Sequence, residues 1–354
     1  MEYNKILIII RRSNGDVFLT IPLIEALKKR YSNAIIDILV NKNTTSIAKT
    51  LPFINTIHIF DYRWKKQGIL SWIKNEFRLI RNIYKKYDLV INLTANDRNV
   101  LYAFLAGKES ISAIESEFIK SWWKKNLVSY HYTIDNKKHM IYSILTPLNI
   151  LGIKIKKIPY KPKVIYSFET IKNKFSLDNK YILFHPSAQF WFRTYPIELI
   201  NSLLSLCKEL NIQIVLSGGK DEINKKISKE IKNFPYVKNL ISKTSIEELY
   251  ALIKYSQVYI GMDTLTTHIA ASFNKKLIAI YGPNSVIQWG PFNPELQYSP
   301  SFDTPPITRY GNFTIIQADM KCVPCNKNGC QGSGKSKCLY NIHPQTIFKE
   351  VKNG

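Results

Sequence analysis

Four short polar segments, each following an apolar run, hold the residues best suited to chemistry. The first is Ser13-Asn14-Gly15-Asp16, which follows the run Ile6 to Ile10. A carboxylate at a strand end, beside helix amides that carry a positive dipole end, can act as a general base on an incoming hydroxyl, so Asp16 is a candidate catalytic residue. The same position also suits a carboxylate that caps a helix beginning near Thr20 to Pro22.

The second segment runs from His185 to Pro196 and again follows a strand-like run. Small Ser187 lets the backbone approach a phosphate, and Arg193 can neutralise its charge through a bidentate fork. A surface loop with a solvated Arg fits the same residues. Pro196 suits the first turn of a following helix.

The third segment is Gly218-Gly219-Lys220-Asp221-Glu222, between a strand-like and a helical stretch. Paired glycines allow a ligand to come close, and a carboxylate just beyond them can accept a hydrogen bond from a ribose hydroxyl. Glycine is also the residue that any tight turn favours.

The fourth segment, Gly261 to His268, places Asp263 and Thr264 at a strand-to-helix junction. Thr264 and the first-turn amides can hold a diphosphate there. His268 follows Thr264 by four residues and lies on the same helix face. The alternative for His268 is a core histidine that is hydrogen-bonded to a backbone carbonyl.

These segments require a scaffold of alternating strands and helices. Strand-like runs at 6–10, 35–40, 56–60 and 88–93 alternate with helical stretches, and the rhythm restarts at 181–184 after a Lys- and Pro-rich linker at 152–162. Such alternation predicts an α/β protein of two doubly wound domains. We expect domains at 1–160 and 161–340, with a ligand cleft between them at the carboxyl ends of the strands, and a terminal helical segment at 341–354.

Length and charge exclude several classes of protein. The 354 residues are 45% hydrophobic and 21% charged, which is globular rather than disordered usage. No apolar run approaches the ~18 residues of a membrane span, and the first residues do not resemble a signal peptide, so we expect a cytoplasmic protein. The net charge of +24 predicts an anionic partner. A nucleic-acid-binding protein is the alternative from another class, but no recognition-helix pattern accompanies the charge.

Four of the five cysteines lie close together near the C-terminus, at Cys322, Cys325, Cys330 and Cys338. This spacing suits a structural zinc ion held by four thiolates, which would order a Gly-rich loop with little core. Free thiols and disulfides are the alternatives. Nothing in the sequence indicates a catalytic metal.

Over nearly its full length the chain resembles glycosyltransferase family 9, the ADP-heptose lipopolysaccharide heptosyltransferases. The resemblance is carried, in matching order and spacing, by KILIIIRRSNGDVFLTIPLIEALKKRY, YDLVINLTANDR, HPSAQFWFRTYP, LSGGKDE, YIGMDTLTTHIAAS and LIAIYGPNS. It implies the GT-B fold of two Rossmann-like domains, with the acceptor bound by the first domain and the nucleotide-sugar donor, ADP-heptose, by the second. The helix at 341–354 would return to the first domain, as in other GT-B proteins.

The resemblance also implies roles for single residues in an inverting, metal-independent transfer. Asp16 would take the acceptor proton, and Arg193 would contact the donor phosphates. Glu222, or its neighbour Asp221, would bind the ribose. The remaining donor contacts would come from Ser187, Gly218, Gly219, Asp263, Thr264 and His268. Two positions depart from the family pattern: Leu265 replaces a usual Gly, and Tyr195 stands where Trp is common.

The acceptor implied by this resemblance is an anionic glycolipid of the lipopolysaccharide core, reached at the cytoplasmic face of the inner membrane. Its candidate contacts in the first domain are Arg11, Arg12, Arg63 and Arg98, together with Lys65 and Lys66; a solvated Lys-rich surface is the alternative. Trp64, Trp122 and Trp123 are candidates for headgroup contact. Leu265 keeps a second function open, which is transfer from a different nucleotide sugar in O-antigen or capsule synthesis.

Overall fold

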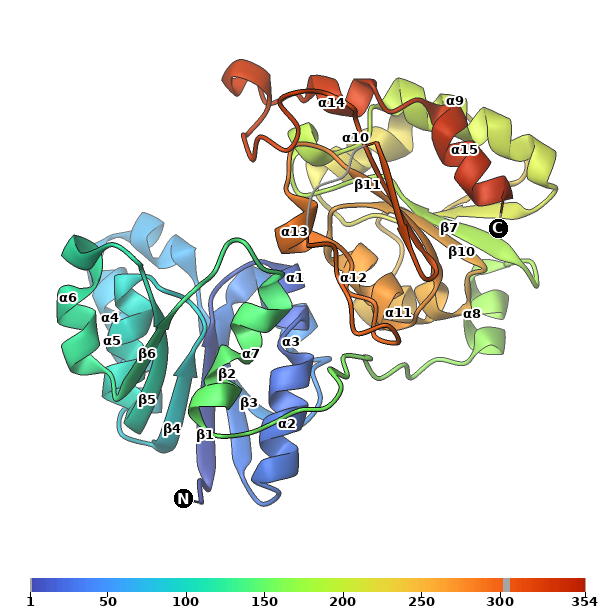
Figure 1. The fold of residues 1–354 in the computed structure, drawn as a ribbon. Helices are drawn as coiled ribbons and strands as arrows, with labels where there is room; N and C mark the ends of the chain where they lie inside the picture. Colours follow the sequence, from blue (N-terminus) through green and yellow to red (C-terminus); the bar gives the residue numbers. More distant parts are fainter. Residues whose placement is uncertain (1, 302–305, 354) are drawn as a thin grey trace. The chain divides into compact units, whose positions relative to one another are not determined.

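The computed structural model describes residues 2–301 and 306–353 and divides into two compact units, Met1–Lys163 and Val164–Gly354 (Figure 1). The division falls just after the linker that the sequence indicates. Each unit has its own sheet, and the strands of both sheets are rich in Ile, Leu and Val because helices cover them on both faces. None of the helices in these residues has the length and apolarity that crossing a bilayer would require.

The first unit is built on a parallel sheet whose six strands, within the described residues, follow the order β3-β2-β1-β4-β5-β6. The neighbouring strands pair in parallel throughout. The strands are β1 (Lys5–Ile10), β2 (Ile35–Asn41), β3 (Ile54–Phe60), β4 (Tyr87–Asn92), β5 (Gly107–Ile114) and β6 (Tyr130–Thr133).

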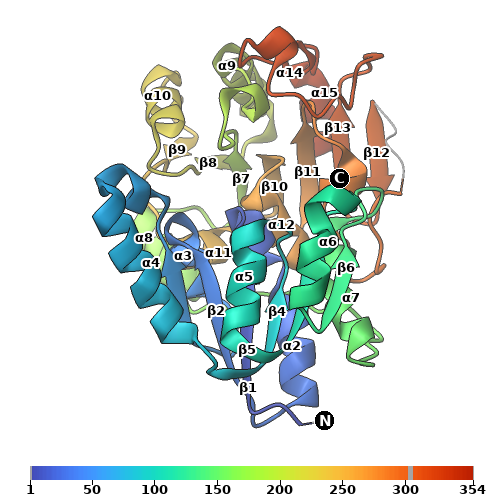
Figure 2. The ribbon, with the colours of Figure 1, turned by 90° about the vertical axis from the view of Figure 1, so that its left-hand side faces the viewer.

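Two helical layers cover this sheet, with α4, α5 and α6 on one face and α2, α3 and α7 on the other (Figures 1 and 2). The helices are α1 (Asn14–Phe18), α2 (Ile21–Arg30), α3 (Thr45–Ala48), α4 (Ile69–Ile83), α5 (Asp97–Ala106), α6 (Phe118–Leu127) and α7 (Met140–Ile150), with short 3₁₀ turns at Lys42–Thr44 and Tyr62–Gln67.

The strand order reverses between β1 and β4, which makes this the switch point of the first sheet. In open α/β sheets, ligands bind outside the carboxyl ends of the strands at such a point. The segment Ser13 to Asp16 follows β1 directly and therefore lies at the position where this topology places a ligand.

The second unit repeats the same topology in the order β12-β13-β11-β10-β7-β8-β9, again for the described residues. All pairs are parallel except the edge pair of β12 and β13. The strands are β7 (Tyr181–His185), β8 (Gln213–Leu216), β9 (Val237–Asn239), β10 (Val258–Met262), β11 (Lys276–Tyr281), β12 (Ile307–Tyr310) and β13 (Phe313–Gln317). Its switch point lies between β7 and β10.

The helices of the second unit include the C-terminal one, which packs within this unit. They are α8 (Phe168–Phe175), α9 (Ile197–Leu206), α10 (Glu222–Glu230), α11 (Ile246–Tyr255), α12 (Leu265–Ser272), α13 (Val286–Trp289), α14 (Lys337–Tyr340) and α15 (Pro344–Lys352), with 3₁₀ turns at Trp191–Arg193, Cys207–Leu210 and Cys330–Gly332. Helix α15 packs against α9 and buries Ile347 and Val351 in the core of the second unit. This segment is therefore part of the second unit, and its expected return to the first domain stays a prediction.

Candidate functional site

Asp16 lies at the switch point of the first sheet, in the first turn of α1. Its side chain is 4% exposed. The Ser13 hydroxyl donates to Asp16 Oδ2 over 2.7 Å, and the Ser13 amide donates to the same oxygen over 3.2 Å. This is a capping box, and it stabilises α1 rather than the helix expected near Thr20 to Pro22.

The second carboxylate oxygen of Asp16 has a different environment. Arg12 Nε lies 3.0 Å from Asp16 Oδ1, so the two charges are in contact. Oδ1 nevertheless accepts no hydrogen bond of good geometry from any described residue. Capping therefore occupies one oxygen and orients the carboxylate, while the other oxygen keeps a lone pair for a proton.

The predicted acceptor arginines have unequal environments. Arg11 is buried: its Nη1 donates to Asn99 Oδ1 over 2.7 Å, and its guanidinium lies 3.5 Å from the centre of the Phe60 ring. Burial lowers the pKa of Arg11. Arg98 lies 5.3 Å from the same ring and 3.7 Å from Glu76. Two of the four expected cations are thus held against the packed interior of the first unit rather than spread over an open surface.

Arg63 is the exposed member of the set. It forms a bidentate ion pair with Asp61, whose pKa is lowered, and Lys42 Nζ lies 3.1 Å from the same carboxylate. Lys65 and Lys66 follow in the same turn, and both are exposed. This segment is the part of the predicted acceptor surface that stays accessible.

In the second unit, the loops after β7 and β10 begin at neighbouring positions. His185 is the residue of β7 that lies opposite Gly261 of β10 in the parallel register. His185 Nδ1 lies 3.0 Å from the Ser217 hydroxyl at the end of β8. The sequence segments at 185–196, 217–222 and 261–268 therefore meet along one edge of the sheet.

Arg193 belongs to the loop after β7 and has an unusual environment for an arginine. Its side chain is half-buried and contacts Phe192, with 5.5 Å between the guanidinium and the ring centre. Arg193 pairs with no acidic side chain among the described residues, and its Nε is buried without a hydrogen-bond acceptor. A partly desolvated guanidinium with no counter-charge favours an anionic ligand.

The turn before α10 is organised by Asn224, which the sequence analysis missed. Ser187 donates to Asn224 Oδ1 over 2.7 Å, and Asn224 Nδ2 donates to Asp221 Oδ2 over 2.7 Å. A Cβ on Gly218 would collide with Asn224 Oδ1, and one on Gly219 would press on Asp221. Both glycines are thus explained by close packing within the protein, and no short-range sequence pattern indicates the role of Asn224.

The same turn separates the two candidate ribose ligands. Asp221 is the N-cap of α10, and its carboxylate accepts hydrogen bonds from the Asn224 backbone and side chain. Glu222 is exposed, and the one ion pair that it forms with a described residue is to Lys225, at 2.6 Å. Of the two carboxylates, Glu222 is the one that can turn toward a ligand at little cost, because a surface ion pair is weak.

The junction of β10 and α12 brings Asp263 and Thr264 to the sheet edge. Asn284, in the turn that follows β11, donates to the Asp263 carboxylate. Thr264 is the N-cap of α12, but its hydroxyl lies 2.8 Å from the Thr266 hydroxyl and does not cap the helix. The first-turn N–H groups of α12 thus donate no hydrogen bond to the Thr264 side chain, which leaves them available to a phosphate.

His268 and the two departures from the family pattern are also placed by the structure. His268 is 3% exposed, within a helix that is buried on most sides. Leu265 is the first residue of α12 and is half-buried. Tyr195 is fully buried, and its hydroxyl donates to the Ile342 carbonyl over 2.6 Å, which ties the loop after β7 to the C-terminal segment.

The two buried histidines of this unit predict a pH-dependent stability. Burial lowers the pKa of His185 and of His268 to about 4. In the unfolded chain both histidines bind protons below about pH 6.5, whereas in the folded protein they stay neutral down to about pH 4. The free energy of unfolding is therefore unaffected above about pH 6.5 and falls between pH 6.5 and 4, by about 2 kcal/mol per histidine at pH 5.

Urea unfolding of the full chain at pH 7.5 and pH 5 measures this loss. A His268→Gln variant removes one of the two titrating groups and is expected to lose less stability between these pH values than the wild type. An equal loss in both proteins would show that His268 does not titrate in this way.

The cysteine cluster gives no metal-ligand geometry. Within residues 2–301 and 306–353, no three His, Cys, Asp or Glu side chains come together as a group that could hold a metal ion. All five cysteines are free thiols, and Cys338 is buried. Burial, followed by the nearby charges of Cys330, Cys325 and Cys322, raises the pKa of the Cys338 thiol to about 11. The four-thiolate zinc site stays a prediction.

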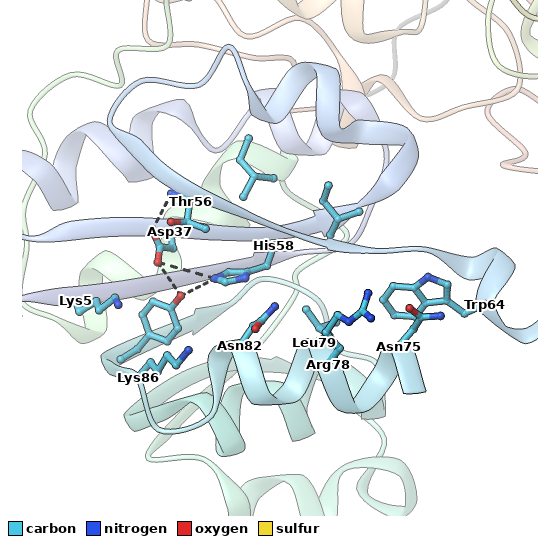
Figure 3. A pocket seen from close by; sticks show the side chains of 13 residues that line it. Lys5, Asp37, Thr56, His58, Trp64, Asn75, Arg78, Leu79, Asn82 and Lys86 are labelled. Carbon is cyan, nitrogen blue, oxygen red and sulfur yellow. Dashed lines mark hydrogen bonds and ion pairs between the residues drawn. The ribbon is translucent and has the colours of Figure 1, made fainter. Parts of the chain in front are cut away.

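A cavity of about 530 Å³ in the first unit lies apart from these segments, between α4 and the edge strand β3 (Figure 3). At its floor the Tyr87 hydroxyl donates to Asp37 over 2.8 Å and lies 2.8 Å from His58 Nε2. Burial lowers the pKa of His58. Lys5, the first residue of β1, also lines the cavity, so this end of it lies opposite to the strand end that carries Asp16.

Comparison with known proteins agrees with this architecture. The chain is 29% identical over 292 residues to lipopolysaccharide heptosyltransferase 3 of Escherichia coli, covering 80% of this chain and 84% of that one. The structure of E. coli ADP-heptose lps heptosyltransferase II superimposes with a TM-score of 0.73 at 19% identity, covering 99% of this chain and 98% of that one. E. coli heptosyltransferase WaaC gives a TM-score of 0.73 at 16% identity and covers 99% of both chains. These structures show that the fold is GT-B.

The family model of glycosyltransferase family 9 (heptosyltransferase) matches residues 76–309, which span parts of both units and include the segments after β7, β8 and β10. Together with the duplicated doubly wound topology and the polar segments at its two switch points, this match establishes that the chain belongs to glycosyltransferase family 9.

Proposed function

We propose that the protein transfers heptose from ADP-heptose to a hydroxyl of a lipopolysaccharide core acceptor, with inversion at the anomeric carbon and without a metal ion. The observation that carries this proposal is Arg193, a half-buried guanidinium with no acidic partner among the described residues. It belongs to the loop after β7, at the switch point where a doubly wound sheet binds its ligand.

The donor would be held by the second unit. When the carbon–oxygen bond to the sugar breaks, negative charge grows on the leaving diphosphate. Arg193 and the first-turn amides of α12 would stabilise that charge most in the transition state, which is how they would accelerate the reaction without a metal ion. Glu222 would accept a hydrogen bond from the ribose, with Asp263 and His268 completing the donor site.

The acceptor hydroxyl would lose its proton to Asp16. As the hydroxyl oxygen forms its bond to the anomeric carbon, the proton would pass to the Asp16 carboxylate and the nucleoside diphosphate would leave with the bonding electron pair. Attack on the side opposite to the leaving group inverts the configuration. The capping box would keep the carboxylate in one orientation throughout.

The choice of donor and acceptor rests on the relatives. A relative at 29% identity is named lipopolysaccharide heptosyltransferase 3, and WaaC, which shares the fold, has been solved with ADP and with ADP-2-deoxy-2-fluoro heptose. A phosphorylated core glycolipid would also suit a chain of net charge +24. We place the reaction at the cytoplasmic face of the inner membrane, with the protein bound peripherally, and we retain a structural zinc ion at the four clustered cysteines as part of the proposal.

A second candidate function is favoured by Leu265. Its side chain stands at the first position of α12, where the family usually has Gly, so the backbone there is less accessible to a diphosphate. The alternative is a family 9 transferase that uses a different nucleotide sugar in O-antigen or capsule synthesis.

Calorimetric titration of the protein with ADP-heptose, UDP-glucose and GDP-mannose distinguishes the two functions. We expect selective binding of ADP-heptose. Selective binding of a UDP or GDP sugar would support the alternative, and the absence of any nucleotide-sugar binding would contradict both functions.

A further inference from the structure

Helix α4 of the first unit presents an unusual apolar surface to solvent. Ile69 is 69% exposed, Leu70 80%, Ile73 53% and Phe77 66%. At about 100° per residue these four side chains, which we call the apolar stripe, share an arc of about 100°. At the same spacing Leu79 and Ile83, which are buried in the core, lie on the flank of the helix beside Ile69 and face away from Leu70 and Phe77. The stripe is therefore additional to the face that the fold itself needs.

Cations border the apolar stripe. Lys74, Arg78 and Arg81 are exposed on the adjoining arc of α4 and form no ion pair with any residue that the structure describes. Lys65 and Lys66 are exposed in the turn just before the helix. A helix with an apolar face flanked by lysine and arginine is the pattern of helices that lie in the plane of a membrane interface.

The neighbouring helices extend this surface. Helix α5 packs against α4 and α6 packs against α5, and the three lie side by side over one face of the sheet (Figure 2). Leu101 and Phe104 of α5 are 42% and 48% exposed, and Ile119 and Trp122 of α6 are 85% and 54% exposed. Exposed apolar side chains on three adjacent helices mark an interaction surface more strongly than scattered ones do.

We infer that the apolar stripe of α4, with its flanking cations, is the surface by which this protein docks on an anionic phospholipid bilayer. Ile69, Leu70, Ile73 and Phe77 would enter the boundary between headgroups and acyl chains, and Lys74, Arg78 and Arg81 would contact lipid phosphates. A second copy of this chain is a poorer occupant, because it would bring the same unpaired cations and a net charge of +24 against them. The inference rests on the proposed lipid-linked acceptor, since it names the surface that would carry the enzyme to it.

Co-sedimentation of the full chain with vesicles tests this surface without donor or acceptor. We expect the wild type to bind vesicles of phosphatidylglycerol and phosphatidylethanolamine and to bind pure phosphatidylcholine weakly. Leu70→Glu/Phe77→Glu is expected to weaken binding to the anionic vesicles by about tenfold or more. The matched control is Ile165→Glu/Leu296→Glu, which makes the same charge change at side chains that are 57% and 55% exposed in the second unit, and it is expected to bind like the wild type.

A milder pair of variants keeps the test independent of folding. Lys74→Gln and Arg81→Gln leave the apolar side chains in place and are each expected to weaken binding to anionic vesicles by about fivefold. Failure of the wild type to bind, or equal binding by wild type and Leu70→Glu/Phe77→Glu, would overturn the inference. So would a wild-type dimer that the glutamate pair dissociates while vesicle binding is unchanged. Nucleotide-sugar binding, measured separately, reports on the proposed function and is expected to be normal in all these variants.

Discussion

Asp16→Asn is expected to lower kcat by about a thousandfold while the affinity for the nucleotide sugar stays within about twofold of the wild type. The amide can still accept the hydrogen bond from the Ser13 backbone that orients this side chain. It cannot take a proton from the acceptor hydroxyl, so the loss falls on the chemical step. Single-turnover kinetics with saturating donor, together with calorimetry of donor binding, measures both quantities.

Ser13→Ala is the control for the structural role of this carboxylate. It removes the hydroxyl that donates to Asp16 Oδ2 and is expected to destabilise the protein by about 1 kcal/mol while leaving most of the activity. If Asp16→Asn instead kept near-normal activity and changed only the melting temperature, capping would be the whole function of Asp16.

Arg193→Ala is expected to weaken binding of the nucleotide sugar by about 100-fold, because a bidentate guanidinium–phosphate contact is lost from a partly desolvated position. Little stability should be lost, since Arg193 supports no ion pair among the described residues. Arg193→Lys is expected to recover part of the affinity, because it restores the charge without the planar fork. Calorimetry with ADP and with ADP-heptose measures these changes.

Arg309→Ala is the matched control for the loss of an arginine in the same unit. Arg309 forms a bidentate pair with Glu350 in the C-terminal helix, and its removal is expected to leave donor affinity unchanged. Equal donor affinity in wild type and Arg193→Ala would remove Arg193 from the donor site and with it the main support for the proposed function.

Most of the fold could be predicted from the sequence because buried parallel strands have an unmistakable composition. The runs at 6–10, 35–40, 181–184 and 277–281 each lie within an observed strand. Strand β5 was missed because its sequence, GKESISAI, begins with charged residues, although Ser110 and Ser112 are buried. Buried polar residues whose side chains are hydrogen-bonded inside the fold do not produce an apolar run in the sequence. Such a strand can be identified only once the neighbouring strands are known.

The candidate site, like the fold, could be predicted from the sequence only in part. Local sequence located the segments at 13–16, 185–196, 218–222 and 261–268, because turn-forming and polar residues that interrupt apolar runs mark strand ends. It could not determine how these residues are used. Arg11, a predicted acceptor contact, is held by Asn99 and Phe60, which lie far from it in the sequence. The hydrogen bonds that join Ser187 to Asn224 and Asn224 to Asp221 could not be predicted either, because the first of them forms only when α10 lies beside the loop after β7.

The sequence by itself thus determined the class of fold, the two-unit organisation and the positions along the chain where chemistry can occur, because periodicity and turn residues act over short distances. The tertiary structure decided which of these positions meet. The order of the strands places β7 beside β10 and β1 beside β4, and only that order brings the segments after β7 and β10 to one sheet edge. Strand order is set by packing between residues far apart in the chain, and such long-range contacts leave no local pattern to read.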